Sequence, residues 1–270
     1  MKPGNELRRV GVARALSKLG FCSRAAAFAL VRAGRVQVNG IVRHGPESPV
    51  HLGKDRIEVD GHPVESSERV YLVLNKPRGV VTTSSDEKGR QTVYAYLGKG
   101  LPWLAPVGRL DRASEGLLLL TNDSEWAGKI VEPQTHLNKT YHVQVAILAD
   151  ESLLNSMIAG VKTSEGTLRV KRASLLRSGK KNSWIEVVMD EGKNRQIRRI
   201  LEGLEVEVLR LIRTQIGPLA LGNLAKGQIR HLTPEEKRAV DRAIEAVTAS
   251  GRQTALSRGN RARTYPRVSG

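Results

Sequence analysis

The chain has 270 residues, which is enough for one large domain and one small one. Lys and Arg number 44 against 27 Asp and Glu, so the formal net charge is +17. An excess of this size is typical of proteins that bind a polyanion, with nucleic acid favoured over a membrane surface. No apolar run approaches the length of a membrane-spanning helix, so we expect no membrane partner.

The excess charge is concentrated at the two ends of the chain. Residues 1–45 contain nine Lys or Arg and one acid, and residues 247–270 contain five Arg and no acid. The residues between them are close to neutral. The tail 247–270 is also rich in Gly, Ser and Thr, and we expect it to stay disordered until RNA is bound.

Residues 10–45 predict two helices followed by a β-hairpin. Apolar residues at helical spacing predict a helix from Val10 to Leu19. Ser23 is expected to cap a second helix from Arg24 to Ala33. Asn39-Gly40 is typical of the two-residue turn between paired strands.

This order of elements, best matched from Val12 to Val42, resembles the RNA-binding domain named after small-subunit ribosomal protein four. The resemblance implies that RNA lies on the basic second helix, at Arg24, Arg32 and Arg35. The alternative is a solvated basic helix surface, but the local excess of positive charge favours RNA contact. We assign residues 1–64 to this α+β domain, with its core at about 8–60 and a polar linker at 65–69.

Residues 70–246 predict a second α+β domain. Strands and helices do not alternate strictly, which argues for a mixed, mainly antiparallel sheet with flanking helices and against a doubly wound fold. The predicted strands are 70–74, 80–83, 117–120, 138–145, 167–173, 183–189, 206–212, 216–219 and 228–232. The predicted helices are 125–131, 151–158, one capped by Asn194, and 234–246.

The loop before the apolar run Leu117–Leu120 holds a carboxylate between two guanidinium groups. Asp111 has Arg109 and Arg112 on either side, and neighbouring cations lower the pKa of a carboxyl. A charged carboxylate beside a rigid strand suits a nucleophile or an electrostatic stabiliser. A surface ion pair is the alternative interpretation.

The turn Asn75–Gly79 is predicted to present Lys76 and Arg78 from a fixed position, because its Pro and Gly favour a tight turn. Lys76 is assigned to RNA binding, and so is Lys139, which lies two residues before Tyr141.

Four motifs are each weak alone and specific together. They are Asn75-Lys76-Pro77-x-Gly79, Gly108-Arg109-Leu110-Asp111 with its continuation to Asp123, Lys139-Thr140-Tyr141, and Glu191-Gly192-Lys193-Asn194-Arg195-Gln196-Ile197-Arg198-Arg199. In this order and spacing they resemble the bacterial ribosomal pseudouridine synthases of the small-subunit type, a family that also includes large-subunit enzymes. The likeness extends to about Val247.

The resemblance implies that the chain isomerises uridine in ribosomal RNA, free or in an assembling subunit, without a cofactor or a metal. The glycosidic bond breaks, the uracil turns, and it rejoins through ring carbon five. Asp111 is then the catalytic carboxylate, whose attack on the sugar or on the base stays open. Tyr141 stacks on the flipped uracil, and Arg198 pairs with Asp111, with Arg195 as the second candidate. Arg109 fills the gap left by the extruded base or grips its phosphate.

Two other classes remain open at this stage. A non-catalytic RNA-binding or ribosome-assembly factor fits the composition equally well. A metal nuclease using Asp111, Glu115 and Asp123 would need magnesium. The six histidines are scattered without metal-ligand spacing, and the single cysteine, Cys22, excludes an internal disulfide. We expect the protein to be cytoplasmic, because the amino terminus leads into no apolar signal region. We also expect a monomer.

Overall fold

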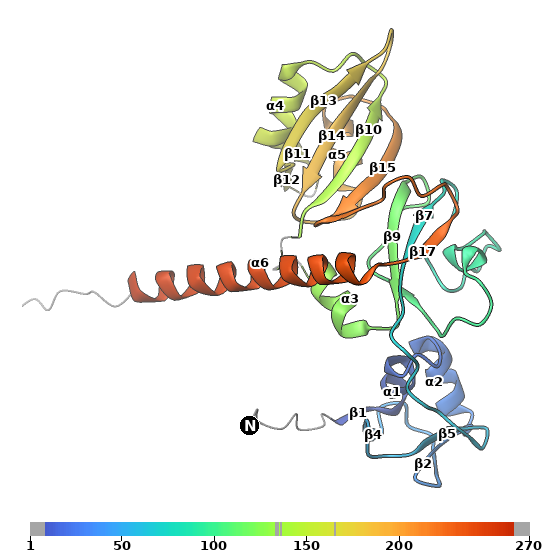
Figure 1. The fold of residues 1–270 in the computed structure, drawn as a ribbon. Helices are drawn as coiled ribbons and strands as arrows, with labels where there is room; N and C mark the ends of the chain where they lie inside the picture. Colours follow the sequence, from blue (N-terminus) through green and yellow to red (C-terminus); the bar gives the residue numbers. More distant parts are fainter. Residues whose placement is uncertain (1–8, 133–134, 136, 165, 262–270) are drawn as a thin grey trace, which may run out of the picture.

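The computed structural model describes residues 9–132, 135, 137–164 and 166–261, with side chains through residue 247 (Figure 1). The chain forms a small N-terminal domain, a large sheet domain and a long final helix. This arrangement confirms the predicted α+β class with a mainly antiparallel sheet.

The N-terminal domain packs two helices on a small antiparallel sheet ordered β3-β2-β5-β6. The Ser23 hydroxyl accepts a hydrogen bond from Ala26 N at 3.0 Å, as predicted for the cap of the second helix. Asn39 and Gly40 both have positive φ, as a primed hairpin turn requires. The elements are β1 Arg9–Gly11, α1 Val12–Lys18, α2 Arg24–Arg32, β2 Val36–Val38, β3 Ile41–Arg43, β4 Pro49–His51, β5 Ile57–Val59 and β6 His62–Pro63.

The large sheet has the order β13-β14-β10-β15-β9-β7-β17, with β16 paired to β15 and β8 to β9. Its neighbouring strands are antiparallel except β9 and β15, a parallel pair that joins the two halves of the sheet. The strands are β7 Tyr71–Lys76, β8 Ala105–Pro106, β9 Glu115–Thr121, β10 Lys139–Val145, β13 Arg172–Ser178, β14 Ser183–Met189, β15 Val208–Ile216, β16 Leu219–Ala220 and β17 Ile229–His231. The 3₁₀ turn η1 covers Val93–Tyr96, and a separate pair is formed by β11 Val161–Thr163 and β12 Gly166–Leu168.

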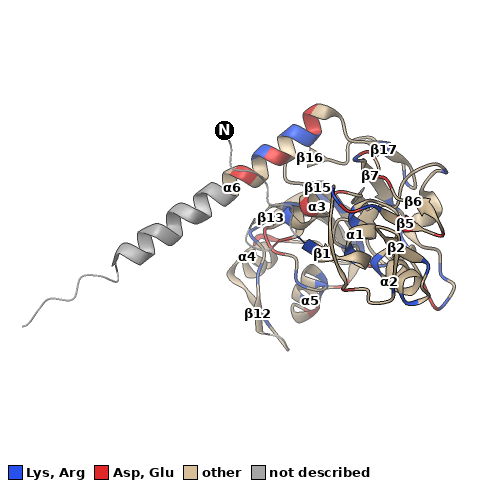
Figure 2. Cartoon of the chain, turned by 90° about the horizontal axis from the view of Figure 1, so that it is seen from below, with Lys and Arg blue, Asp and Glu red and all other residues tan. Residues whose placement is uncertain are grey.

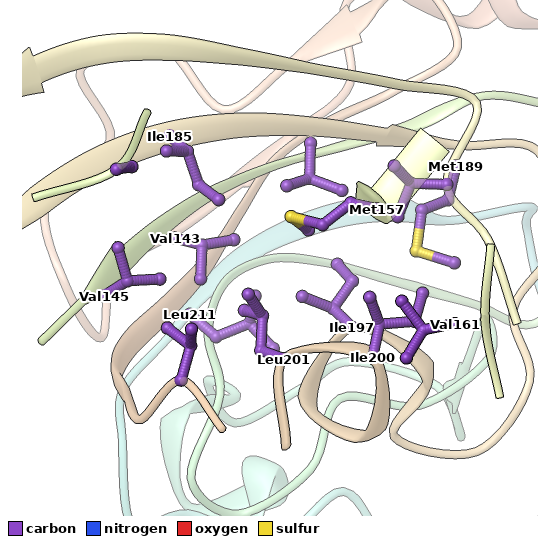
Figure 3. Packing of buried hydrophobic residues seen from close by; sticks show 14 of the residues in the cluster. Val143, Val145, Met157, Val161, Ile185, Met189, Ile197, Ile200, Leu201 and Leu211 are labelled. Atoms are coloured by element: carbon purple, nitrogen blue, oxygen red, sulfur yellow. The ribbon is translucent and has the colours of Figure 1, made fainter. Parts of the chain in front are cut away.

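Each half of the sheet has its own helices and its own core. Helices α4 Glu151–Ala159 and α5 Gln196–Gly203 cover the half that contains β10, β13 and β14 (Figure 3). Met157 of α4 and Ile200 of α5 are fully buried there. Helix α3 Ser124–Val131 and the start of α6 Pro234–Arg261 pack on the other half through Trp126 and Val240.

The junction between the halves depends on Gly116. Its φ is 101°, and a Cβ at this position would lie 2.3 Å from the backbone oxygen of Arg213 on β15. Only glycine permits this approach without displacing one of the strands. The close contact fixes the start of β9, and with it the Asp111 loop, against β15.

The last helix is longer than the sequence predicted. Helix α6 continues to Arg261, so the tail expected to be disordered from residue 247 is helical over most of its length. Residues 247–261 include two Gly, two Ser and two Thr, which are weak helix formers, so local propensity does not explain this extension. Arginines near the helix C-terminus do favour the helix dipole. Residues 262–270 lie outside the described part. Through residue 247, α6 contains both acidic and basic residues, coloured red and blue in Figure 2.

Three other local predictions were wrong. The strand predicted at 167–173 is divided between β12 and β13, and residues 80–83 form only a bridge between Val81 and Thr92. Helix α5 is preceded by Arg195 in a left-handed conformation, in place of an Asn194 cap. Within the described part, no helix has both the length and the apolar character needed to cross a membrane.

Candidate active site

Lys76 holds the Asp111 loop from inside the sheet. Its ammonium group donates hydrogen bonds to the carbonyl oxygens of Pro77, Asp111 and Ser114, at 3.0, 3.1 and 2.9 Å. Burial lowers the pKa of Lys76 to about 8, against the opposing effect of the Asp111 and Glu115 carboxylates. A buried cation with all three donors used is a structural anchor.

This location contradicts the prediction that Lys76 faces RNA, because its side chain is 0% exposed. The predicted strand ended at residue 74, whereas β7 continues to Lys76. Residues of a strand alternate between the two faces, so the side chain of Lys76 is directed by the sheet and not by the turn that follows. Arg78 is exposed, as predicted, and donates to the Leu209 carbonyl at 3.2 Å.

The other backbone carbonyls of the loop are also hydrogen bonded. Leu110 accepts from Thr82 Oγ1 at 2.8 Å, Arg112 from Gly79 N at 2.7 Å, and Ala113 from Arg198 Nη2 at 3.1 Å. Every carbonyl from residue 110 to residue 114 therefore has a donor. A loop held in this way presents Asp111 with little conformational freedom.

Arg195, and not Arg198, is the guanidinium that approaches the Asp111 carboxylate. Arg195 Nη1 lies 4.0 Å from Asp111 Oδ2, and the Asp111 side chain is 31% exposed. The ion pair predicted between Arg198 and Asp111 is not formed, because Arg198 binds the Ala113 carbonyl instead. Burial, and then Arg195, lower the pKa of Arg198, while Asp111 opposes that shift. Arg198 thus supports the loop, and Arg195 remains at the carboxylate.

A cavity of about 570 Å³ brings together five of the predicted site residues: Asp111, Tyr141, Arg109, Lys139 and Arg195. Its volume is in the range of sites for small molecules, and so is large enough for one nucleotide base. Much of its wall is apolar, from Val107, Ile130, Val131, Met189, Ile197, Leu211 and Ile216.

Tyr141 lies in the middle of the sheet on β10. Its cross-strand neighbours are Val187 on β14 and Arg213 on β15. The ring packs against the cores of both halves of the sheet and also lines the cavity. This position gives an aromatic surface that is held rigidly beside the open space.

The arginines predicted to bind RNA in the N-terminal domain lie away from this cavity. Arg24 and Arg32 are exposed on α2. Arg35 is exposed too, but its Nε donates to Asp60 Oδ1 at 2.8 Å, so its charge is partly compensated within the domain. The structure therefore has two separate basic regions, one on α2 and one at the cavity.

The acids of the nuclease alternative do not come together. Glu115 is buried, and although burial alone raises a carboxyl pKa, hydrogen bonds from Arg210 and Lys226 hold the pKa of Glu115 below its usual value. Asp123 caps α3 and accepts a hydrogen bond from the Tyr71 hydroxyl at 2.9 Å. Within the described ranges, no three His, Cys, Asp or Glu side chains are grouped so that they could hold a metal ion.

Arg213 also lines the cavity, and it was not predicted from the sequence as a site residue. Arg213 is 4% exposed, and its Nε donates to the Leu117 carbonyl at 2.7 Å. The predicted strand stopped at residue 212. The signal that was available is a charged residue within an otherwise apolar run, which is unusual at a buried position.

A family model, sequence relatives and a solved structure all match this chain to pseudouridine synthases. Residues 70–203 match the family model described as RNA pseudouridylate synthase, and residues 11–57 match the S4 domain. Ribosomal large subunit pseudouridine synthase B of Bacillus subtilis is 40% identical over 227 residues, covering 83% of this chain and 92% of that protein. An uncharacterised RNA pseudouridine synthase of Rickettsia prowazekii is 38% identical, covering 82% and 94%. A solved pseudouridylate synthase structure superposes with a TM-score of 0.60 at 26% identity, covering 86% of this chain and 99% of that one.

Proposed function

The chain belongs to the RNA pseudouridine synthase family, and from this premise we propose that it converts specific uridines of ribosomal RNA into pseudouridine, with Asp111 as the catalytic carboxylate. The observation that carries the proposal is the hydrogen-bonded loop that presents Asp111 to a base-sized cavity shared with Tyr141. Because hydrogen bonds already fix this loop, it does not have to become ordered on substrate binding before Asp111 can react.

The reaction exchanges one bond of C1′ for another. The C1′–N1 bond breaks and its electron pair stays with the uracil, which turns within the cavity. The C1′–C5 bond then forms, the proton on C5 is lost to a base, and N1 takes up a proton. Atoms and electrons balance without an external oxidant or reductant.

The cavity residues have distinct roles in this proposal. Tyr141 stacks on the flipped uracil, an interaction worth about 1–3 kcal/mol per base. Arg195 orients the Asp111 carboxylate, and Lys139 lies on the wall beside them. Arg109 is exposed at the cavity and occupies the space that the base leaves in its stack.

The substrate is RNA of the large ribosomal subunit. This part of the proposal is supported by the 40% identical relative from Bacillus subtilis, which is named for the large subunit. The N-terminal domain adds a second contact through Arg24, Arg32 and Arg35. The N-terminal domain and the cavity then bind the RNA together, and the shape of the RNA determines which uridine enters the cavity.

The proposal is tested by mapping pseudouridine in both ribosomal RNAs from cells with and without the gene. We expect a modified position in large-subunit RNA to disappear on deletion and to return with the wild-type gene, but not with Asp111→Asn. Identical maps with and without the gene would leave a non-catalytic assembly factor as the function. Restoration by Asp111→Asn would remove Asp111 from the chemistry.

A further inference from the structure

The cavity wall contains two positive charges that the catalytic carboxylate does not use. Lys139 and Tyr141 are two residues apart on β10 and so lie on one face of the sheet. Arg213 is the cross-strand neighbour of Tyr141 on β15. All three line the same cavity.

Arg213 has hydrogen-bonding capacity that the protein leaves unused. The residue is 4% exposed, and Nε is satisfied by the Leu117 carbonyl. Its Nη2 atom is buried and has no hydrogen-bond partner among the residues that the structure describes. An unpaired donor on a buried cation is costly, and a ligand acceptor at this wall would relieve the cost.

The positive charge of Lys139 lies near the positive charge of Arg213. Burial, and then the positive charge of Arg213, lower the pKa of Lys139, while Asp190 opposes the shift. The other acids of the wall are engaged elsewhere: Glu191 accepts from Gln196 at 2.7 Å, and Asp111 faces Arg195. Two cations kept close together in a half-buried wall are stabilised when an anion arrives between them.

Building on the proposed function, we propose that Lys139 and Arg213 form the site that receives the negative charge of the uracil when the glycosidic bond breaks. When C1′–N1 breaks, the electron pair on N1 delocalises onto the O2 and O4 atoms of the ring. Attack of Asp111 on ring carbon six would place charge on O4, one of the same two ring oxygens. The cation pair therefore serves either route.

The two cations act on the rate because the charge they bind is absent from the bound uridine. An interaction that strengthens only as the charge forms lowers the barrier, whereas equal binding of substrate and transition state does not. Fixed donors of this kind typically contribute about 10²–10³-fold in rate each.

The test compares two RNAs that differ in how well the leaving uracil carries a negative charge. One has uridine at the target position, and the other has 5-fluorouridine, whose fluorine stabilises the anion. Single-turnover loss of the starting nucleoside is followed in digests, with wild type, Lys139→Met and Arg213→Lys. Lys162→Met is the matched control, because Lys162 is an exposed lysine on β11 outside the cavity.

For Lys139→Met we expect about a 10²-fold slower reaction with uridine and a defect several-fold smaller with 5-fluorouridine. Arg213→Lys, which keeps the charge but loses the planar fork, follows the same pattern with a smaller defect. The RNA dissociation constants of both variants stay near wild type, as does the melting temperature of Lys139→Met. Arg213→Lys loses the hydrogen bond from Nε to the buried Leu117 carbonyl, so its melting temperature falls, and rates are compared below that temperature. Lys162→Met behaves as wild type on both RNAs.

Defects of equal size on both RNAs, or a loss confined to RNA binding, contradict the charge-receiving role and leave the proposed function intact. A wild-type protein that turns over neither RNA contradicts the proposed function, and this inference with it.

Discussion

A single buried lysine connects the sheet to the catalytic loop. Lys76→Met removes the donor of three carbonyls, and each buried polar group left unsatisfied costs about 1–3 kcal/mol. We expect the free energy of unfolding to fall by about 2–5 kcal/mol, as for other broken buried networks. RNA affinity of the folded fraction should stay the same, since Lys76 is not exposed. Urea unfolding and RNA titration measure the two effects, and a loss of affinity without a loss of stability would return Lys76 to the RNA surface.

Lys76 also gives the stability a specific pH dependence. Burial lowers its pKa to about 8, so between pH 8 and the ordinary lysine pKa near 10.4 the unfolded chain binds more protons than the folded chain. Stability rises with pH wherever the unfolded state binds more protons. The free energy of unfolding of wild type should therefore increase relative to Lys76→Met from pH 7.5 to 9.5, by at most about 1.4 kcal/mol per pH unit.

Comparing the two proteins isolates Lys76. Tyr71 and Tyr94, whose pKa values burial raises to about 12, weaken both proteins equally above pH 10. Parallel pH curves for wild type and Lys76→Met would show that the lysine is not buried in its charged form.

Arg195 and Arg198 both lie near Asp111, but their different contacts predict different effects when each is substituted. Arg198→Gln removes the donor of a loop carbonyl from a half-buried position, so we expect a lower melting temperature. Arg195→Gln changes an exposed side chain, so turnover should fall while the melting temperature stays near wild type. Thermal melts and single-turnover rates on both variants test this division, and the reverse pattern would restore Arg198 as the partner of Asp111.

At the scale of single residues, motif order was sufficient to select five of the residues that line the cavity, including Asp111 and Tyr141. It was not sufficient for Lys76 or Arg213, because each lies at or just beyond the end of a predicted strand. An error of one or two residues at a strand end changes whether a side chain is assigned to a turn or to the sheet.

Among the elements, the parallel contact of β9 with β15 sets the position of the site. Gly116→Ala would place a Cβ 2.3 Å from a backbone oxygen at a φ of 101°, so we expect a loss of several kcal/mol, about the cost of severe overpacking and strain together. Gly128→Ala in α3 meets nothing within 4 Å and should stabilise the protein by about 0.4–1 kcal/mol. Chemical denaturation of the two variants tests the close approach of Gly116 to the Arg213 backbone. Equal changes in the free energy of unfolding for Gly116→Ala and Gly128→Ala would contradict it.

Most helices and strands could be predicted because their signals are local, as at the Ser23 cap and the strand Ser183–Met189. The start of α5 could not, because the backbone at Arg195 adopts φ 48°, an unusual value for a residue with a side chain. No capping pattern of the sequence encodes this conformation.

The molecule as a whole combines an RNA-binding domain, a catalytic sheet and a basic C-terminal extension. The two domains touch where Trp103 N donates to the Gly20 carbonyl at 3.0 Å and Lys18 pairs with Glu125 at 2.8 Å. The side chain of Asn122 bridges Glu68 O and Val70 N, so the predicted linker is held by hydrogen bonds. Such long-range contacts could not be predicted from the composition of residues 65–69.

Deleting residues 248–270 removes five arginines and no acid. We expect weaker RNA binding and a smaller salt dependence of the dissociation constant, by about 0.7–0.9 in the log–log slope for each phosphate that the protein no longer neutralises. The single-turnover rate of bound RNA should not change. Titrations at several salt concentrations measure this, and equal affinity at matched salt would show that the extension does not bind RNA.

The most direct test of the catalytic assignment uses purified protein and ribosomal RNA lacking the modification. Asp111→Asn preserves the shape of the side chain and removes only its charge. We predict that wild type forms pseudouridine at a defined uridine, whereas Asp111→Asn forms none and binds the RNA with the wild-type dissociation constant. Pseudouridine formed by Asp111→Asn at a rate near wild type would contradict it.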